Sequence, residues 1–185
     1  KINTSYNGLN VTIPFKNEVI SYLDELDEEA KILNNVNCIS IKEGVLKGYN
    51  TDKYGFDMLC ARNAIVIENR KCMVLGAGSS AKTVVKSLID SGAREIIIKN
   101  KSEKNALKVK EFAKKLGFTN IALFSNQQSS CELIVNATPL GMYSMQDKDN
   151  FFDMNVNNNT DLIDLIYISK STMFLNKFET RGKKV

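Results

Sequence analysis

The chain has 185 residues, of which 43% are hydrophobic and 25% charged, a composition typical of a globular protein with one large domain or two small ones. Lysine and arginine total 25 against 21 acidic residues, giving a net charge of +4. This excess is mild and contains no dense basic run, so we expect no nucleic-acid partner. No apolar stretch approaches the length of a membrane span, and the first residues do not resemble a signal peptide. We therefore expect a cytoplasmic protein with no membrane partner.

The chain has four cysteines and no histidine. No two cysteines form a Cys-x-x-Cys pair, which excludes the common structural zinc sites, and we expect no bound metal. Scattered cysteines of this kind are typical of reduced thiols in a cytosolic protein. Without histidine, an acid–base catalyst must be Lys, Asp, Glu, Tyr or Cys, which excludes enzymes built around a catalytic histidine. The four are Cys38, Cys60, Cys72 and Cys131.

Residues 1–67 predict a partial α/β domain that binds substrate. Its few strands lack enough partners for a stable sheet, so we expect this part to be incomplete. A long helix from Asp52 to about residue 67 leads into the second part. The other expected elements are a strand over 8–12, a helix over 17–26, and a hairpin of strands 36–42 and 45–49.

Residues 68–170 alternate strands and helices, which predicts an α/β domain with a Rossmann-type doubly wound parallel sheet. Ile96, Ile97 and Ile98 are consecutive apolar residues, as a strand buried on both faces requires. Residues 147–159 are expected to form a loop, and 171–185 to begin a C-terminal helix that returns toward the substrate domain. We expect strands over 72–75, 95–99, 121–124, 133–136 and 162–166, and helices over 79–91 and 102–116.

A glycine-rich turn follows the first of these strands and opens a helix. In Gly76-Ala77-Gly78-Ser79-Ser80-Ala81, the first glycine permits a tight turn and the second lets a pyrophosphate approach the backbone. The N-terminus of the helix offers unpaired N–H groups and a partial positive charge to the phosphates. The pattern favours a dinucleotide site over a purely structural glycine turn.

The residues after the second strand favour NADP(H) over NAD. An NAD enzyme usually places a carboxylate there to hold the ribose 2′-hydroxyl. This chain has Lys99, Asn100, Lys101 and Ser102 instead, with Lys104 close behind. The alternative is that these lysines are the solvated start of a helix.

Two segments of the first part are rich in polar residues. Thr12 and Lys16 flank Pro14, and Asn50-Thr51-Asp52 stands at the start of a helix. On the residues alone, Asp52 as a helix N-cap and Lys16 as an exposed lysine is the simpler interpretation.

Five motifs in order nevertheless give the chain a resemblance to the shikimate dehydrogenases. They are NVTIPFK (10–16), NTDxxGF (50–56), GAGxxAK (76–82), NATPLGM (136–142) and DLIYxxxxTxFL (164–175). The resemblance implies an NADP-dependent oxidoreductase that reduces 3-dehydroshikimate to shikimate, on the way to chorismate and the aromatic amino acids. The substrate of this family binds in a cleft between two domains.

The resemblance also assigns roles to individual residues. Lys16 becomes the acid–base residue and Asp52 its partner. A neighbouring carboxylate favours the ammonium form and desolvation opposes it, and this balance suits a proton donor. Thr12, Asn37 and Tyr167 are implied to contact the substrate. The cofactor residues are Gly76, Ala77, Gly78, Ser79 and Ser80 in the turn, Asn100, Lys101 and Ser102 at the adenosine 2′-phosphate, and Thr138 and Leu165 beyond.

The chain also departs from the family pattern. It begins after the Ser-x-Ser segment that holds the substrate carboxylate and ends before the glutamine of the C-terminal helix, so this chain by itself is expected to be inactive. Lys101 replaces an arginine, which removes a planar two-pronged donor. The second basic residue of the clamp falls on Asn105, next to Lys104.

The motifs also bear on three alternative functions. One is a quinate/shikimate dehydrogenase that uses NAD, and another is a non-catalytic NADP-binding relative. A short-chain dehydrogenase, with Tyr49 and Lys53 as its Tyr-x-x-x-Lys pair, is excluded because that pair precedes the glycine turn. The remaining expectation about partners is a homodimer.

Overall fold

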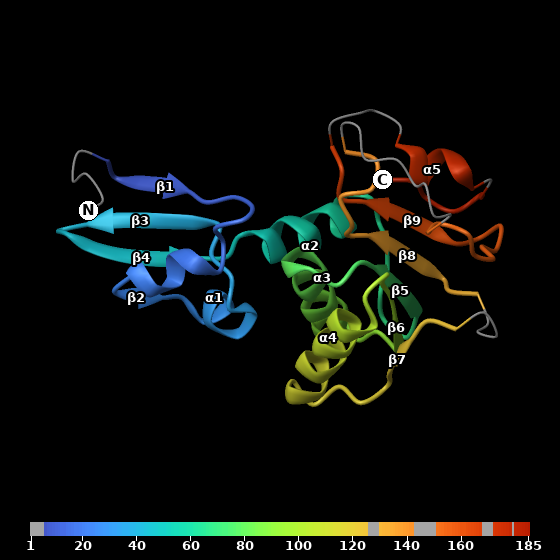
Figure 1. Ribbon diagram of the computed structural model, residues 1–185. Coiled ribbons are helices and arrows are strands. Elements are labelled where there is room, and N and C mark those ends of the chain that lie inside the picture. Colours follow the sequence, from blue (N-terminus) through green and yellow to red (C-terminus); the bar gives the residue numbers. More distant parts are fainter. Residues whose placement is uncertain (1–5, 126–129, 143–150, 168–171, 179) are drawn as a thin grey trace. The chain divides into compact units, whose positions relative to one another are not determined.

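A computed structural model of the chain describes residues 6–125, 130–142, 151–167, 172–178 and 180–185 (Figure 1). The chain divides into two compact units, Lys1–Gly55 and Phe56–Val185. The division falls inside the helix α2 (Asp52–Arg62), whereas the sequence predicts a boundary after residue 67. None of the helices in the described part of the chain is both long enough and apolar enough to span a membrane.

The first unit is built on a four-stranded sheet in the order β1-β3-β4-β2. The predicted hairpin is confirmed: β3 and β4 pair antiparallel, from Cys38 opposite Tyr49 to Lys42 opposite Val45. Glu43 and Gly44 make the turn with positive φ angles of 52° and 81°. The strands are β1 (Gly8–Asn10), β2 (Glu25–Leu26), β3 (Cys38–Lys42) and β4 (Val45–Tyr49).

The helix predicted over residues 17–26 is wrong. A short 3-10 helix, η1 (Glu18–Tyr22), is followed by β2 and then by an α-helix, α1 (Glu28–Leu33). Asp24 ends the helical conformation because its backbone N–H donates to the Leu46 carbonyl (3.0 Å) and its carboxylate accepts from the Leu46 N–H (2.8 Å). These bonds align the chain with β4.

The second unit contains five parallel strands in the order β7-β6-β5-β8-β9. The chain order reverses between β5 and β8, so the predicted Rossmann-type doubly wound sheet is confirmed. Helices α3 (Ser79–Asp90) and α4 (Glu103–Lys115) connect β5 to β6 and β6 to β7. The strands are β5 (Lys71–Leu75), β6 (Glu95–Lys99), β7 (Ile121–Leu123), β8 (Leu133–Asn136) and β9 (Asp161–Asp164).

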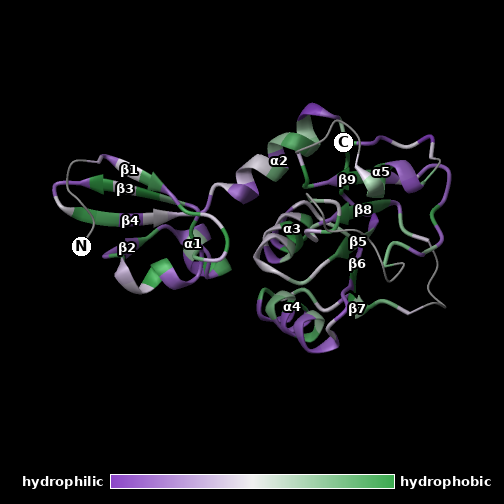
Figure 2. Ribbon diagram, turned by 45° about the horizontal axis from the view of Figure 1, so that its top comes forward, coloured by the Kyte–Doolittle hydropathy of each residue, from purple (hydrophilic) through white to green (hydrophobic). Residues whose placement is uncertain are grey.

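Alternate residues of this sheet enter two separate cores. Cys72 and Val74 pack with the α2, α3 and α4 side chains, whereas Met73 and Leu75 pack on the opposite face. That face is covered by phenylalanines from the segments flanking β9. Figure 2 shows the resulting pattern, with hydrophobic residues along the strands and hydrophilic ones over much of α4. The phenylalanines are Phe151, Phe152, Phe174 and Phe178.

The end of the chain differs from the expected helix over 171–185. Within the described residues of that range, α5 (Met173–Lys177) is the helical part, and the last residues run along β9. The Leu162 and Asp164 N–H groups donate to the Lys183 and Val185 carbonyls, both at 2.7 Å. A parallel bridge between Leu162 and Lys184 extends the sheet beyond β9.

Candidate active site

Lys16 and Asp52 form an ion pair in the first unit. Lys16 Nζ lies 2.7 Å from Asp52 Oδ2, and the two side chains are 15% and 35% exposed. Asp52 is the first residue of α2, and Lys16 follows the segment that contains the cis peptide bond between Ile13 and Pro14. The Lys16 carbonyl accepts from the Val36 N–H at 2.8 Å, which fixes the lysine backbone next to the start of β3.

Asn37 completes the cluster by holding the other Asp52 oxygen. Its Nδ2 donates to Asp52 Oδ1 at 2.7 Å and to Thr51 Oγ1 at 2.9 Å, and its Oδ1 accepts from the Thr51 N–H at 2.9 Å. Asn37 is itself placed by its N–H bond to the Tyr49 carbonyl (3.0 Å). One cation and one amide therefore hold the two carboxylate oxygens in a fixed orientation.

This geometry separates the two interpretations of Lys16 and Asp52. Asp52 uses both oxygens on Lys16 and Asn37, and Lys16 is mostly buried. The helix-cap and exposed-lysine interpretation therefore does not describe these residues. Thr51 also belongs to the cluster. The sequence shows it within the polar run Asn50-Thr51-Asp52 but assigns it no role.

The two other expected substrate residues, Thr12 and Tyr167, belong to different units. Thr12 is exposed, and its carbonyl accepts from the Phe15 N–H at 2.9 Å in a turn. Tyr167 belongs to the second unit, where it follows β9 and is 95% exposed. The structure thus groups Lys16, Asn37 and Asp52.

At Gly76 the glycine turn packs closely against the segment after β8, and among the described residues a β-carbon on Gly78 would meet open space. Gly76 has a φ of +106°, and a β-carbon there would lie 2.9 Å from the Ala137 carbonyl oxygen. Gly78 is the N-cap of α3, whose first residues, Ser79 and Ser80, present N–H groups without partners inside the helix. Ala77 packs against the neighbouring core.

The segment after β6 combines exposed cations with a helix cap. Ser102 is the N-cap of α4 and accepts from the Asn105 N–H, while Asn100 Nδ2 donates to the Ser102 carbonyl at 2.9 Å. Lys101 and Lys104 are exposed. Lys99 points elsewhere: its Nζ lies 4.2 Å from the centre of the Phe124 ring and donates to the Asp153 carbonyl. Lys101 and Lys104 are thus exposed cations at the start of α4.

Thr138 and Leu165 follow β8 and β9 at the same edge of the sheet. A β-carbon on Gly76 would lie 3.1 Å from Thr138 Cγ2, so Thr138 stands against the glycine turn. The Leu165 N–H donates to the Asn136 carbonyl at 3.1 Å. Two buried polar residues, Asn136 and Asp164, end these strands; they begin two of the five motifs, but the resemblance assigns them no role. Burial raises the pKa of Asp164, and hydrogen bonds from Thr172, Ile166 and Asn136 oppose that rise.

The cysteines are free thiols, and three of them are buried. Burial raises the pKa of Cys60 to about 11 and of Cys72 and Cys131 to about 12. These three side chains are therefore neutral near pH 7 and act as small hydrophobic residues.

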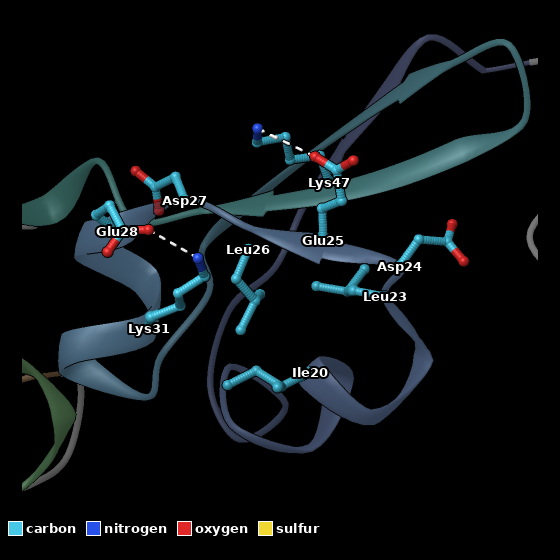
Figure 3. A pocket seen from close by; sticks show the side chains of 9 residues that line it. All are labelled: Ile20, Leu23, Asp24, Glu25, Leu26, Asp27, Glu28, Lys31 and Lys47. Carbon is cyan, nitrogen blue, oxygen red and sulfur yellow. Dashed lines mark hydrogen bonds and ion pairs between the residues drawn. The ribbon is translucent and has the colours of Figure 1, made fainter.

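A pocket of about 720 Å³ in the first unit offers no comparable chemistry (Figure 3). Its charged rim is internally paired: Lys47 lies 3.1 Å from Glu25, and Lys31 lies 2.7 Å from Glu28. Asp27 caps α1 through the Ala30 N–H. The floor is formed by Ile20, Leu23 and Leu26.

Two sequence profiles match the chain. Residues 2–39 match the shikimate dehydrogenase substrate binding domain, and residues 59–164 match shikimate / quinate 5-dehydrogenase. The second match covers more than half of the chain. The chain belongs to the shikimate/quinate 5-dehydrogenase family.

Members of this family resemble the chain over nearly all of its length. It is 38% identical to a shikimate dehydrogenase (NADP(+)) from Clostridium beijerinckii over 96% of this chain and 64% of that protein. A shikimate 5-dehydrogenase structure from Thermus thermophilus, in complex with NADP(H) and shikimate, is 26% identical with a TM-score of 0.82, over 98% of this chain and 67% of that one. One from Listeria monocytogenes, in complex with shikimate and NAD, is 25% identical with a TM-score of 0.81, over 97% and 66%.

The chain spans just under two thirds of the length of the curated shikimate dehydrogenases that it matches first. Within that span lie both polar centres of this family member. The first is the Lys16, Asn37 and Asp52 cluster, and the second is the glycine turn with the strand ends around it.

Proposed function

We propose that the protein is an NADP-dependent shikimate dehydrogenase, which reduces 3-dehydroshikimate to shikimate and catalyses the reverse oxidation. The observation that carries the proposal is the hydrogen-bonded cluster of Lys16, Asp52 and Asn37. A cofactor-binding protein without turnover has no need of a mostly buried lysine held in line by an oriented carboxylate.

Lys16 moves the proton in this reaction. In the reducing direction, its ammonium donates a proton to the substrate oxygen as that oxygen changes from carbonyl to hydroxyl. In the oxidising direction, the neutral amine takes the proton back. Asp52, 2.7 Å from Nζ, orients the amine, and Asn37 keeps the carboxylate from rotating away.

The residues at the carboxyl end of the sheet fit a dinucleotide. Among the described residues, a β-carbon on Gly78 would meet open space, so a pyrophosphate can approach the backbone there. The N-terminus of α3 presents N–H groups and a positive partial charge to it. Lys101 and Lys104 would hold an adenosine 2′-phosphate, and the run Lys99 to Ser102 contains no carboxylate to repel it. NADPH, when bound there, supplies the hydride.

Steady-state oxidation of shikimate by the full-length protein tests the proposal, with NADP and NAD compared side by side. We expect shikimate with NADP to give the highest kcat/KM. Turnover with NAD at equal efficiency would keep the roles of Lys16 and Asp52 but contradict the role of Lys101 and Lys104. Turnover with quinate at equal efficiency would support the quinate/shikimate dehydrogenase instead. Binding of NADPH without turnover of any substrate would support the non-catalytic relative instead.

The setting of the protein is part of the same proposal. Three buried thiols and the absence of a disulfide among the described residues suit a reducing, cytoplasmic compartment. We expect a homodimer and no affinity for nucleic acid. Analytical ultracentrifugation of the full-length protein, with and without DNA, measures both.

A further inference from the structure

A series of hydrogen bonds connects side chains at the carboxyl ends of β8 and β9. The sequence assigns no role to these side chains. The series begins at the N-terminus of α5. The Thr172 hydroxyl accepts from the Leu175 N–H at 3.2 Å and donates to Asp164 Oδ2 at 2.5 Å. Thr172 is 4% exposed and Asp164 is 8% exposed, so this contact is shielded from water.

Asp164 connects Thr172 to β8 through hydrogen bonds. Its Oδ1 accepts from Asn136 Nδ2 at 3.0 Å and from the Ile166 N–H at 3.1 Å. Asn136 is fully buried, and its own Oδ1 accepts from the Thr138 N–H at 3.1 Å and the Thr138 hydroxyl at 2.6 Å. This series of hydrogen bonds ends where the Leu140 N–H donates to Thr138 Oγ1 at 3.2 Å.

Thr138, at the end of this series of hydrogen bonds, lies beside the glycine turn that is proposed to receive the cofactor phosphates. Thr138 Cγ2 would be 3.1 Å from a β-carbon on Gly76. In a doubly wound sheet, a dinucleotide lies across the point where strand order reverses, with one nucleoside on each side of the glycine turn. The adenosine lies toward the end of β6, so the nicotinamide nucleoside lies toward β8 and β9. Residues 137–142 are therefore on the nicotinamide side.

We propose that Asp164 and Asn136 are positioning residues that hold residues 137–142 in the conformation that receives the nicotinamide half of NADPH. This inference rests on the proposed function, because it takes NADPH as the ligand. Among the described residues, the Asp164 oxygens accept from the Thr172 hydroxyl, the Asn136 amide and the Ile166 N–H. Asn136 in turn accepts from the backbone N–H and the hydroxyl of Thr138. These hydrogen bonds join the N-cap of α5 to residues 137–142.

The experiment compares two ligands by calorimetric titration of the purified chain. NADPH occupies both halves of the site, whereas 2′,5′-ADP occupies the adenosine half alone. For Asp164→Ala we expect the Kd for NADPH to rise about tenfold and the Kd for 2′,5′-ADP to change less than about twofold. Asp164→Asn should restore NADPH binding, because one oxygen still accepts from Asn136 and Ile166 while the Thr172 hydroxyl can accept from the new amide.

Thr160→Val is the matched structural control. Thr160 is as buried as Thr172, and its hydroxyl donates to the Cys131 carbonyl at 2.8 Å, at the opposite end of β8 and β9. We expect this variant to bind both ligands as the wild-type chain does. If Asp164→Ala does not fold, Thr172→Val removes one donor to Asp164 in a side chain of the same shape and is expected to weaken NADPH binding selectively.

Three results would overturn the inference: unchanged NADPH binding by Asp164→Ala, equal weakening of both ligands, or an Asp164→Asn variant as weak as Asp164→Ala. A wild-type chain that binds 2′,5′-ADP but gains nothing from the nicotinamide half would also overturn it. A wild-type chain that binds neither ligand would contradict the proposed function itself, so the two failures are distinguishable.

Discussion

At the scale of single residues, Lys16 is the group on which the proposed chemistry depends. In the full-length protein, the Lys16→Ala variant removes the group that takes the proton during shikimate oxidation and leaves the residues around Gly76 untouched. We expect kcat for shikimate oxidation to fall at least about a hundredfold, the usual minimum for loss of a general acid–base group. The Kd for NADPH, measured by titration, should stay within about twofold of wild type. A variant with near-normal kcat would assign the proton transfer to another residue.

Asn35 is a second residue with a testable consequence, this time for stability. It is 1% exposed, and its Nδ2 and Oδ1 have no hydrogen-bond partner among the described residues. An unpaired buried amide costs about 1–3 kcal/mol, so Asn35→Ala should raise the free energy of unfolding by about 1 kcal/mol in urea denaturation. Asn50 is the matched control.

Asn50 is similarly buried, but its side chain is paired. It donates to the Asn35 carbonyl at 3.1 Å and accepts from the Asp52 N–H at 3.1 Å. Asn50→Ala should therefore lower the free energy of unfolding by about 1–2 kcal/mol. If both alanine variants are destabilised alike, Asn35 has a partner in solution, such as a buried water.

Asp164 predicts a pH dependence of stability. Burial is the main cause of its raised pKa, so the folded state holds this proton more tightly than the unfolded chain does. The cost of the buried charge is absent at pH values below about 4, the pKa of aspartate in an unfolded chain, and grows as the pH rises through the folded pKa. Asp164→Asn has no proton to lose. The Tm of the variant minus that of wild type should therefore increase as pH rises above about 4, and a constant difference in thermal scans would contradict this.

At the scale of elements, the sequence predicted most strands and the glycine turn because their signals are local. Three consecutive isoleucines favour a strand buried on both faces, and Gly76 and Gly78 act at the junction of one strand and one helix. The helix over 17–26 failed because Asp24 bonds to Leu46, a residue distant in sequence. The helix from Asp52 ends at Arg62 for a local reason: Ala64 takes a φ of +48° and the Ile65 N–H returns to the Cys60 carbonyl.

The candidate site, like the fold elements, was predicted in part from the sequence. The Lys16 and Asp52 pair came from motif resemblance, since 36 residues separate the two in the chain and no periodicity connects them. The buried series of hydrogen bonds through Asp164 and Asn136 was not predicted, because neither residue is unusual by itself. Each gains its meaning from a partner on the neighbouring strand.

The packing of η1 and β2 on β4 depends on Gly48. A β-carbon there would meet Leu23 Cδ1 at 2.5 Å and Val36 Cγ2 at 2.8 Å. Gly48→Ala should lower the free energy of unfolding by about 1–3 kcal/mol through overpacking, as measured by urea denaturation. Gly55→Ala is the control with the opposite expected sign: Gly55 lies inside α2 with open space around it, and alanine favours a helix by about 0.5–1 kcal/mol. Equal effects of the two substitutions would contradict this account.

At the scale of the whole molecule, the two units differ in how their sheets are buried. In the first unit, the fully buried hydrophobic cluster consists of Ala30, Val36 and Ile39, with partly buried neighbours around it. In the second unit, β5, β6 and β8 are covered on both faces by two larger clusters. A sheet with more buried apolar surface requires a larger opening before its amides meet water, so the two units should differ in local stability.

Amide hydrogen exchange with peptide-level mass spectrometry measures this difference directly. We expect the β3 and β4 amides to exchange at least about tenfold faster than those of β5, β6 and β8. Addition of 2′,5′-ADP should slow exchange at Gly76 to Ser80 and after β6, because bound phosphates accept from those N–H groups. It should leave β3 and β4 unchanged, since no proposed contact of the adenosine half lies in the first unit. Protection of β3 and β4 equal to that of β5 would show that the first unit draws its stability from more than its small buried cluster.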